Sequence, residues 1–140
     1  MRIEDVTSVL AVGNEEKHFR ITERSSGFWS EQVLINWVKS DSGVALVAVE
    51  NQKIEGFALA TVQSVTRKAE LENLWVSSRY QGRGLSIILL QEVIRKLEES
   101  RMVDVIIALT EVEHHTIQNM LKKRVGFEKG KAFVWMKLKI

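Results

Sequence analysis

Hydrophobic and polar residues follow two different periods along the chain. In four segments apolar residues recur every three or four positions, and this spacing predicts amphipathic helices. These segments are residues 4–12, 30–39, 85–100 and 115–124. Ser30 precedes the second helix and can cap it. On the third, Glu92 and Lys96 stand four residues apart and are expected to pair. Gly126 fits the end of the fourth helix.

Other segments are apolar runs or alternate with the period of a strand. They are residues 44–50, 54–64, 69–76, 103–109 and 132–140. The polar residues Asn51, Gln52 and Lys53 separate the first two, so these two strands are expected to form a hairpin. The run 103–109 is rich in β-branched residues and predicts a strand buried on both faces.

The order of these elements predicts one α/β (α+β) domain with a mixed sheet. The chain has 140 residues, of which 45% are hydrophobic, and no linker or repeat divides it, so residues 1–140 are expected to form a single domain. No window approaches the roughly 18 apolar residues of a membrane span, and the N-terminus does not resemble a secretory signal. With no cysteine either, a cytoplasmic location is expected.

The charge and the histidines of the chain bear on two kinds of partner, nucleic acids and metal ions. The formal net charge is +2 and the basic residues are dispersed, so a nucleic-acid partner is not expected. The same residues leave open a weaker alternative, a nucleic-acid module using Arg79, Arg83 and the basic cluster 122–124. His114 and His115 are adjacent and have no third ligand nearby, so no metal site is expected.

The stretch "RYQGRGLS", residues 79–86, joins the apolar run 69–76 to the helix 85–100. A strand that enters a helix through glycines leaves backbone N–H groups free where the helix dipole favours an anion. Gly82 and Gly84 can adopt positive φ, and Arg79, Gln81 and Arg83 can add donors. The spacing is neither that of a P-loop nor that of a dinucleotide fingerprint, so the stretch is either another kind of phosphate site or a strand–helix turn that needs glycine only for its geometry.

The motif resembles the coenzyme A loop of the GNAT superfamily of N-acetyltransferases, Arg/Gln-x-x-Gly-x-Gly/Ala. The segments "AELENLWVSSRYQGRGLS" and "LKKRVGF" resemble other parts of the same family, and the likeness covers residues 44–140 well. It implies a mixed, mostly antiparallel central sheet flanked by about four helices. It also implies that acetyl-CoA is the cofactor and that an acetyl group passes to a primary amine of a protein, peptide or small molecule.

The resemblance assigns cofactor contacts residue by residue. The backbone of Leu74, Trp75 and Val76 would pair with the pantetheine arm in a gap between two strands. The pyrophosphate loop comprises Arg79, Tyr80, Gln81, Gly82, Arg83, Gly84, Leu85 and Ser86, with the N–H groups of residues 81–86 as its donors. His115 or Asn119 stands in for an asparagine that contacts the cofactor in many relatives.

The implied chemistry is direct attack of a neutral amine on the thioester, which calls for a base. Candidate bases are Glu72 and Glu111, with Glu70 and Glu113 less favoured, and each can instead be a solvated surface carboxylate. Strand alternation predicts that Glu72 points to the same side as Leu74 and Val76.

Lys122 occupies the position of a tyrosine that protonates the departing thiolate in many relatives. An ammonium there could stabilise the thiolate, or it could be one exposed lysine of a basic run. This departure keeps open a second function, a coenzyme A-binding sensor or partner domain without turnover.

The amine acceptor is expected near residues 19–32, which carry Phe19, Phe28 and Trp29 with charges of both signs. Aromatic side chains there can also belong to the core. The alternating residues 132–140 lack a proline that would protect a strand edge, so a homodimer is plausible.

Overall fold

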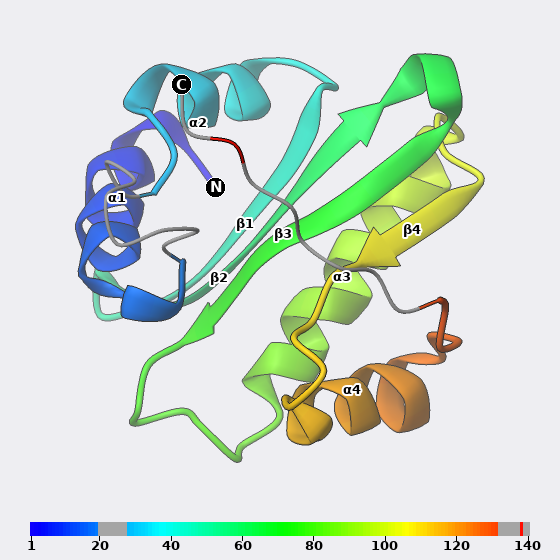
Figure 1. The fold of residues 1–140 in the computed structure, drawn as a ribbon. Coiled ribbons are helices and arrows are strands. Elements are labelled where there is room, and N and C mark those ends of the chain that lie inside the picture. Colours follow the sequence, from blue (N-terminus) through cyan, green and yellow to red (C-terminus); the bar gives the residue numbers. More distant parts are fainter. Residues whose placement is uncertain (20–27, 132–137, 139–140) are drawn as a thin grey trace. The chain divides into compact units, whose positions relative to one another are not determined.

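The computed structural model describes residues 1–19, 28–131 and 138 (Figure 1). The chain forms two compact units, Met1–Leu109 and Thr110–Ile140. The first unit contains the sheet, the N-terminal helices and the long helix that follows the glycine loop.

Two α-helices with short 3-10 turns precede the sheet, as the apolar spacing predicted. The bounds are η1 Ile3–Asp5, α1 Val6–Glu15, η2 Lys17–Phe19 and α2 Glu31–Lys39. Ser30 is the N-cap of α2, where its side chain accepts a hydrogen bond of 3.4 Å from the Val33 N–H. The predicted cap is therefore confirmed, because this contact satisfies one of the N–H groups that a helix start leaves free.

Four strands form one sheet in the order in which they occur in the chain. They are β1 Gly43–Glu50, β2 Lys53–Gln63, β3 Lys68–Val76 and β4 Val105–Ala108, with the 3-10 turn η3 Ser64–Thr66 between β2 and β3. β1, β2 and β3 are antiparallel neighbours, whereas β4 runs parallel to β3. The predicted hairpin is confirmed. Its two-residue turn has positive φ at both Asn51 (49°) and Gln52 (65°), which is the geometry of a type I′ turn.

Two β-bulges interrupt the sheet, and each has a glutamate as its extra residue. In β2, Ile54 and Gly56 pair with successive residues of β1, so Glu55 has no partner there. In β3, Leu71 and Asn73 pair with successive residues of β2, and Glu72 is skipped. A bulge breaks the alternation of side chains along its strand. Both bulges therefore determine where a carboxylate points.

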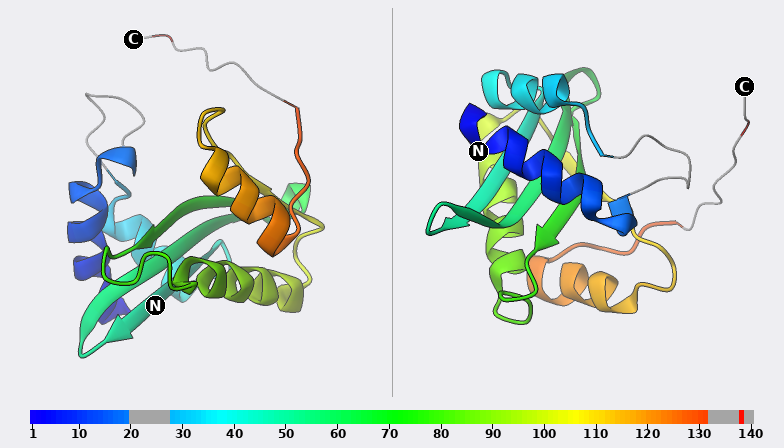
Figure 2. Two further views of the ribbon diagram at one scale, coloured as in Figure 1. Left: turned by 90° about the horizontal axis from the view of Figure 1, so that it is seen from below. Right: turned by 90° about the vertical axis from the view of Figure 1, so that its left-hand side faces the viewer.

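Helices cover both faces of this sheet (Figures 1 and 2). On one face α1 and α2 pack over β1 and β2 around Phe57, Leu34 and Val9, all fully buried. On the other face lies α3, Leu85–Ser100, whose Leu89, Leu90, Val93 and Leu97 are buried. Full burial of each such side chain contributes about 1.5–3 kcal/mol, so these two apolar layers hold the unit together.

The long helix α3 has the predicted bounds, but its ion pairs differ from the expected one. Arg95, and not Lys96, is the partner of Glu92, at 2.6 Å, and Arg95 also pairs with Glu99. The planar guanidinium reaches two carboxylates, at spacings of three and four residues. The expected pair of Glu92 with Lys96 was wrong because the competing arginine lies one residue nearer.

The strand β4 is shorter than predicted and is not buried on both faces. Its four residues pair with the start of β3, from Lys68 with Val105 to Leu71 with Ala108. Val105 is 50% exposed, and Leu109, just beyond the strand, is 63% exposed. The apolar run identified the strand correctly, but β-branched composition alone does not determine burial. The predicted strand 132–140 lies almost entirely outside the described residues.

The second unit contains the predicted helix. The α-helix α4, His115–Met120, continues into a wider π-helical turn, Leu121–Val125. Gly126 ends it with a φ of 95°, and its N–H donates to the Leu121 carbonyl at 2.9 Å. The prediction that Gly126 caps this helix is confirmed.

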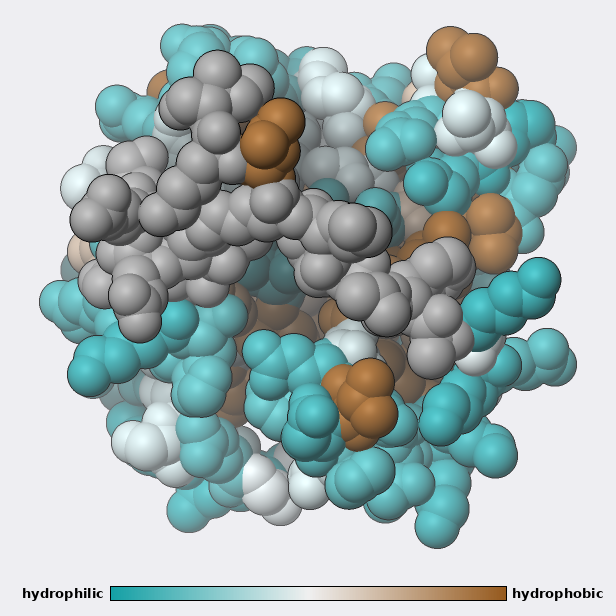
Figure 3. Space-filling model, in the orientation of Figure 1, coloured by the Kyte–Doolittle hydropathy of each residue, from teal (hydrophilic) through white to brown (hydrophobic). Residues whose placement is uncertain are grey.

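The architecture is the mixed α/β class, with a mostly antiparallel four-stranded sheet and four α-helices among the described residues. On the face drawn in Figure 3, hydrophilic side chains predominate and hydrophobic ones form small separate groups. None of the helices in the described part of the chain is long and apolar enough to cross a membrane.

Candidate cofactor and active site

The glycine loop between β3 and α3 has the geometry of an anion cradle. Gly82 and Gly84 adopt φ values of 73° and 84°, which residues with a side chain rarely adopt. A Cβ added at either position would have no protein atom within 4 Å, so the loop borders open space. Gly84 is the N-cap of the 16-residue helix α3. The positive end of the helix dipole therefore faces this space.

Part of the loop's backbone is free to bind a ligand. Within the described residues, the N–H groups of Gly82, Gly84 and Leu85 have no backbone acceptor. The N–H of Gln81 donates to Ser77, and that of Arg83 donates to Tyr80, at 3.1 and 3.2 Å. The resemblance assigned all N–H groups of residues 81–86 to the pyrophosphate. In this structure Gln81 and Arg83 instead close the turns that shape the loop, which leaves the two glycines and the helix start as donors.

The two arginines of the loop have different surroundings. Arg79 lies 2.9 Å from Glu50 and 3.8 Å from Glu55, measured between guanidinium Nη1 and carboxylate oxygens. Arg83 is exposed, and no carboxylate of the described chain lies within ion-pair distance of it. Tyr80 lies between them, with the guanidinium carbons 5.5 and 5.9 Å from its ring centre. The neighbouring Glu50 carboxylate is the main cause of a raised pKa at Tyr80.

The far half of β3 has one free edge. On the β2 side, β3 is paired along its length to Val76, but on the β4 side the pairing stops at Leu71 with Ala108. Leu74, Trp75 and Val76 therefore have no strand partner on that side among the described residues. The Gln81 side chain donates to the Val76 carbonyl at 3.3 Å. A free strand edge that leads into the glycine cradle suits an extended amide-bearing chain.

Glu72 lies on the face of the sheet that α1 and α2 cover, opposite to its predicted side. Leu74 and Val76 pack in the cluster under α3, whereas Glu72 accepts a hydrogen bond of 2.8 Å from Thr61. Thr61 follows Leu59 with strand alternation, and Leu59 belongs to the α1 and α2 cluster. The predicted side was wrong because the bulge at Glu72 shifts the alternation by one residue.

The carboxyl of Glu72 is half-buried. Burial raises its pKa, the hydrogen bond from Thr61 opposes this, and the negative charge of Glu70 raises it further. The net direction is upward from the ordinary value of 4.5. A carboxylate with a raised pKa is a stronger base at neutral pH than an exposed one. Glu72 can thus accept a proton from a group that approaches this face.

Aromatic side chains surround the neighbouring residue on β3. The indole N–H of Trp29 donates to the Asn73 side chain at 2.7 Å, and the Trp29 ring packs edge-on against Trp37. Trp75 stacks on the buried ring of Phe57, with ring centres 5.7 Å apart. In the expected acceptor segment, Phe19 and Phe28 pack on the core, while residues 20–27 lie outside the described chain. Asn73 was not predicted; the only signal was a polar residue between apolar ones.

The remaining predicted residues belong to the second unit, where the structure places them relative to each other. The Glu111 carboxylate lies 3.3 Å from the imidazole Nε2 of His114, and its side chain is 74% exposed. His115 begins α4, and Asn119 lies one turn along it; both are exposed. Lys122 lies exposed in the π-helical turn. Over the described part of the chain, no group of histidine and carboxylate side chains could hold a metal ion.

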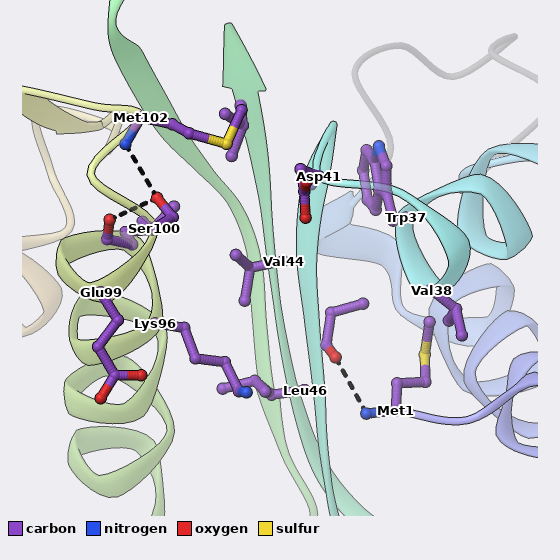
Figure 4. Close-up of a pocket in the computed structure, with 14 residues that line it drawn as sticks. Met1, Trp37, Val38, Asp41, Val44, Leu46, Lys96, Glu99, Ser100 and Met102 are labelled. Atoms are coloured by element: carbon purple, nitrogen blue, oxygen red, sulfur yellow. Dashed lines mark hydrogen bonds between the residues drawn. The ribbon is translucent and has the colours of Figure 1, made fainter. Parts of the chain in front are cut away.

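A cavity of about 360 Å³ lies elsewhere in the first unit (Figure 4). It is bordered by Trp37 and Asp41 on one side, by β1, and by Lys96 and Met102 at the C-terminal end of α3. The glycine cradle lies at the N-terminal end of the same helix, and Gly84 is about 18 Å along the axis from Lys96, the first α3 residue that borders the cavity. The cavity is therefore separate from the candidate site.

Many solved structures have this fold. A putative acetyltransferase from Agrobacterium tumefaciens is 17% identical with a TM-score of 0.74, and 99% of this chain matches 96% of that one. The aminoglycoside acetyltransferase meta-AAC0020 from an uncultured soil metagenomic sample, solved with sisomicin, is 16% identical, with a TM-score of 0.72 and coverages of 99% and 93%. AAC(6')-Iy, solved with the bisubstrate analogue CoA-S-monomethyl-acetylneamine, is 15% identical, with a TM-score of 0.70 and coverages of 100% and 95%.

Among curated proteins, no sequence matches the chain. A family model does match it. The model for the acetyltransferase (GNAT) family covers residues 11–127, from within α1 to the residue after the Gly126 cap. This range contains the glycine cradle, the free edge of β3 and both bulges. On this evidence the chain belongs to the GNAT family of acetyltransferases.

Proposed function

We propose that this protein is an N-acetyltransferase that transfers an acetyl group from acetyl-CoA to a primary amine bound in the same complex. The observation that carries the proposal is the glycine cradle. It combines positive φ at Gly82 and Gly84, open space in front of them, and the N–H groups of Gly82, Gly84 and Leu85, which have no backbone acceptor within the described part of the chain. A phosphate group is an anion that such a backbone can bind. Membership of the GNAT family supports coenzyme A as its source.

The proposal gives the first unit's residues two binding roles. The N–H groups of Gly82, Gly84 and Leu85 hold the pyrophosphate, with Arg83 as a nearby cation. The free backbone edge of residues 74–76 pairs with the amide groups of the pantetheine arm. Bound acetyl-CoA supplies an acetyl thioester as the electrophile. The family match runs through both compact units, which supports treating residues 1–140 as one functional domain.

Glu72 is the base that we assign to the reaction. Its half-buried carboxylate has a raised pKa and lies on the face of β3 that carries Asn73 and Trp75. It removes a proton from the amine, directly or through water, as the nitrogen attacks and the carbon–sulfur bond breaks. Glu111 is a weaker candidate because it is exposed and paired with His114. Roles for Lys122 beside the thiolate and for His115 or Asn119 beside the cofactor rest on the family resemblance alone.

The acceptor is proposed to be an amine that enters beside Glu72, on the side of Trp29, whose indole binds the neighbouring Asn73. Two structural neighbours are named as aminoglycoside acetyltransferases. Aminoglycosides are therefore the first acceptors to test, followed by polyamines and peptide amines. Glu70, whose negative charge raises the pKa of Glu72, adds a second carboxylate to this site, and two carboxylates favour a cationic acceptor.

The test is a thermal melt of the protein with and without millimolar acetyl-CoA. At a concentration of 100 times its dissociation constant, a ligand adds about 2.7 kcal/mol, which raises Tm by several degrees in a domain of this size. Gly84→Glu fills the cradle with bulk and negative charge and should abolish the shift. Gly130→Glu is the matched control, since no atom lies within 4 Å of a Cβ there and it should keep the shift.

A second measurement separates an enzyme from a binding domain. Thiol release from acetyl-CoA is followed while amines are added one at a time. A stabilised protein that releases thiol with an amine is an acetyltransferase. A stabilised protein that releases none with any amine fits the alternative, a coenzyme A-binding domain without turnover. Absence of any shift in Tm would contradict both.

A further inference from the structure

Arg79, the first arginine of the glycine motif, forms ion pairs with carboxylates of the protein. Its guanidinium is therefore not free to bind an anion in front of the loop. Arg79 Nη1 lies 2.9 Å from Glu50 Oε2, which belongs to the last residue of β1. The same nitrogen lies 3.8 Å from Glu55 Oε1, at the bulge of β2. Two carboxylates and one guanidinium give this group of side chains a formal net charge of −1. Such a group repels a pyrophosphate.

The carboxylate of Glu55 is an unusual partner because it is buried. Its side chain is only 5% exposed, and its other oxygen accepts a hydrogen bond of 2.5 Å from the Ser77 hydroxyl. The Ser77 N–H also donates to the Glu55 carbonyl, at 2.9 Å. A buried charge is stable only when it has a counter-charge and hydrogen bonds. Ser77 and Arg79, two residues of the loop, supply these to Glu55.

Glu50 extends the same network to the hairpin turn. Its Oε2 is buried and makes no aligned hydrogen bond with the described residues, so the guanidinium of Arg79 is the charge that compensates it. Glu50 is the residue before the turn at Asn51 and Gln52. The loop is thus fastened at both Glu50 and Glu55, which lie on either side of this turn.

Arg83 lacks these partners. It follows Gly82, its side chain is exposed, and its N–H closes the turn with Tyr80. Among described carboxylates, none lies within 4 Å of its guanidinium. Of the two arginines in the motif, it alone keeps its charge available for an anion in the cradle.

We propose that Arg79 is a positioning residue, which fixes the cofactor loop to Glu55 and to the β1–β2 turn, and that Arg83 is the loop's side-chain cation for the pyrophosphate. The part concerning Arg83 rests on the proposed function. The part concerning Arg79 does not, because it describes the ligand-free loop.

The first experiment measures amide hydrogen exchange of the ligand-free protein over residues 77–86. Arg79→Met keeps the aliphatic stem and removes the charge, and Glu50→Gln removes one partner. Both should raise exchange in this segment several-fold while the centre of β2 stays protected. Arg83→Met is the matched control and should leave exchange unchanged. Equal exchange in Arg79→Met and Arg83→Met would overturn the positioning role, even if the protein binds no acetyl-CoA.

The second experiment measures the affinity for acetyl-CoA. Whether Glu50→Gln weakens or strengthens binding distinguishes a positioning role of Arg79 from direct phosphate binding. If Arg79 positions the loop, Glu50→Gln weakens binding, by up to about tenfold for the loss of one charge-assisted contact. If Arg79 binds phosphate itself, Glu50→Gln frees it and removes a nearby negative charge, so binding becomes tighter. The double variant Arg79→Met with Glu50→Gln should bind about as weakly as Arg79→Met alone. Tighter binding by Glu50→Gln would overturn the proposal.

Failure of the proposed function has a different signature. A wild-type protein that binds no acetyl-CoA would remove the role of Arg83, while the exchange experiment would still decide that of Arg79. Glu50 is chosen over Glu55 because its side chain is 41% exposed and its substitution leaves the buried carboxylate in place.

Discussion

The Thr61 hydroxyl donates a hydrogen bond to Glu72 across neighbouring strands, with an oxygen–oxygen distance of 2.8 Å. The bond favours the ionised carboxylate, yet burial outweighs it and the pKa of Glu72 is raised. A base of this kind is protonated at acidic pH and becomes active as the pH rises. The charge of Glu72 is therefore open to measurement in two independent ways, through catalysis and through stability.

In catalysis, Glu72→Gln should lower kcat/KM by about 100-fold or more, the size of a general-base contribution. It should also remove the rise of kcat/KM with pH that reports the carboxyl. Glu70→Gln is the matched control. It keeps the base and removes a negative charge that raises the pKa of Glu72, so the rise should move to lower pH. A pH–rate profile measured for the three proteins tests this, and an unchanged profile in Glu72→Gln would assign the base elsewhere.

In stability, the raised pKa has a definite sign. The folded protein binds a proton at Glu72 more tightly than the unfolded chain does, so this group lowers the free energy of unfolding as the pH rises above the ordinary value of 4.5. Glu72→Gln cannot titrate. We therefore expect the stability of the variant relative to wild type to increase between pH 4 and pH 8. Urea unfolding at both ends of the range measures it; a constant difference would contradict the raised pKa.

The hydrogen bond between Trp29 and Asn73 should be measurable as a coupling. Asn73→Ala leaves the partly buried indole N–H without an acceptor and should cost about 1–3 kcal/mol. Trp29→Phe removes the donor. If the bond exists, the double variant should lose less than the two single losses together, by about 1 kcal/mol. Denaturant unfolding of the four proteins gives this energy, and losses that add would show that the contact contributes nothing.

Gly13 lies in the last turns of α1, where alanine would ordinarily stabilise a helix by about 0.5–1 kcal/mol. Here an added Cβ would lie 2.2 Å from Cδ1 of Phe28. Such overpacking costs about 1–3 kcal/mol, so we expect Gly13→Ala to lower Tm. Gly130→Ala meets no atom within 4 Å and should leave Tm nearly unchanged. A more stable Gly13→Ala protein would mean that Phe28 does not pack against the helix.

The hairpin turn offers a stabilising substitution. Gln52 has a φ of 65°, in the left-handed region that costs a residue with a side chain about 1–2 kcal/mol. Gln52→Gly creates the Asn-Gly pair favoured by this turn. Part of the gain is offset by about 0.4–1 kcal/mol through the freer unfolded chain. A rise of a few degrees in Tm is expected, whereas Gln32→Gly within α2 should lower Tm; a lower Tm for Gln52→Gly would reject the turn geometry.

Most of the fold could be predicted from local patterns. The helices, the hairpin and the glycine cradle depend on spacing, capping and φ, which neighbouring residues determine, and α3 was predicted with its observed bounds. The bulges could not be predicted, because they arise from the register between strands. Without them the side chain of Glu72 is assigned to the wrong face, and Glu55 is only a lone charge in an apolar run. The competition of Arg95 with Lys96 for Glu92 likewise depends on side-chain geometry.

The role of Arg79 likewise could not be predicted from the sequence. The motif predicted a donor for the pyrophosphate, and the residue type is right for that task. Its actual partners, Glu50 and Glu55, are 29 and 24 positions earlier in the chain. Only the sheet brings them to the loop. A charge in a motif is available to a ligand only where the fold leaves it without an ion-pair partner, as Arg83 is among the described residues.

The extra residue at Glu72 shifts the alternation of side chains along β3 by one position. Before it, Ala69 and Leu71 face α3; after it, Leu74 and Val76 do. If Glu72 took a regular paired position and the bulge were lost, strict alternation would turn Asn73 and Trp75 toward α3 and exchange the two surfaces of the strand's second half. The bulge thus keeps apolar side chains of both halves of β3 in the layer under α3. It also lets the adjacent residues Glu72 and Asn73, together with Trp75, face the layer of α1 and α2.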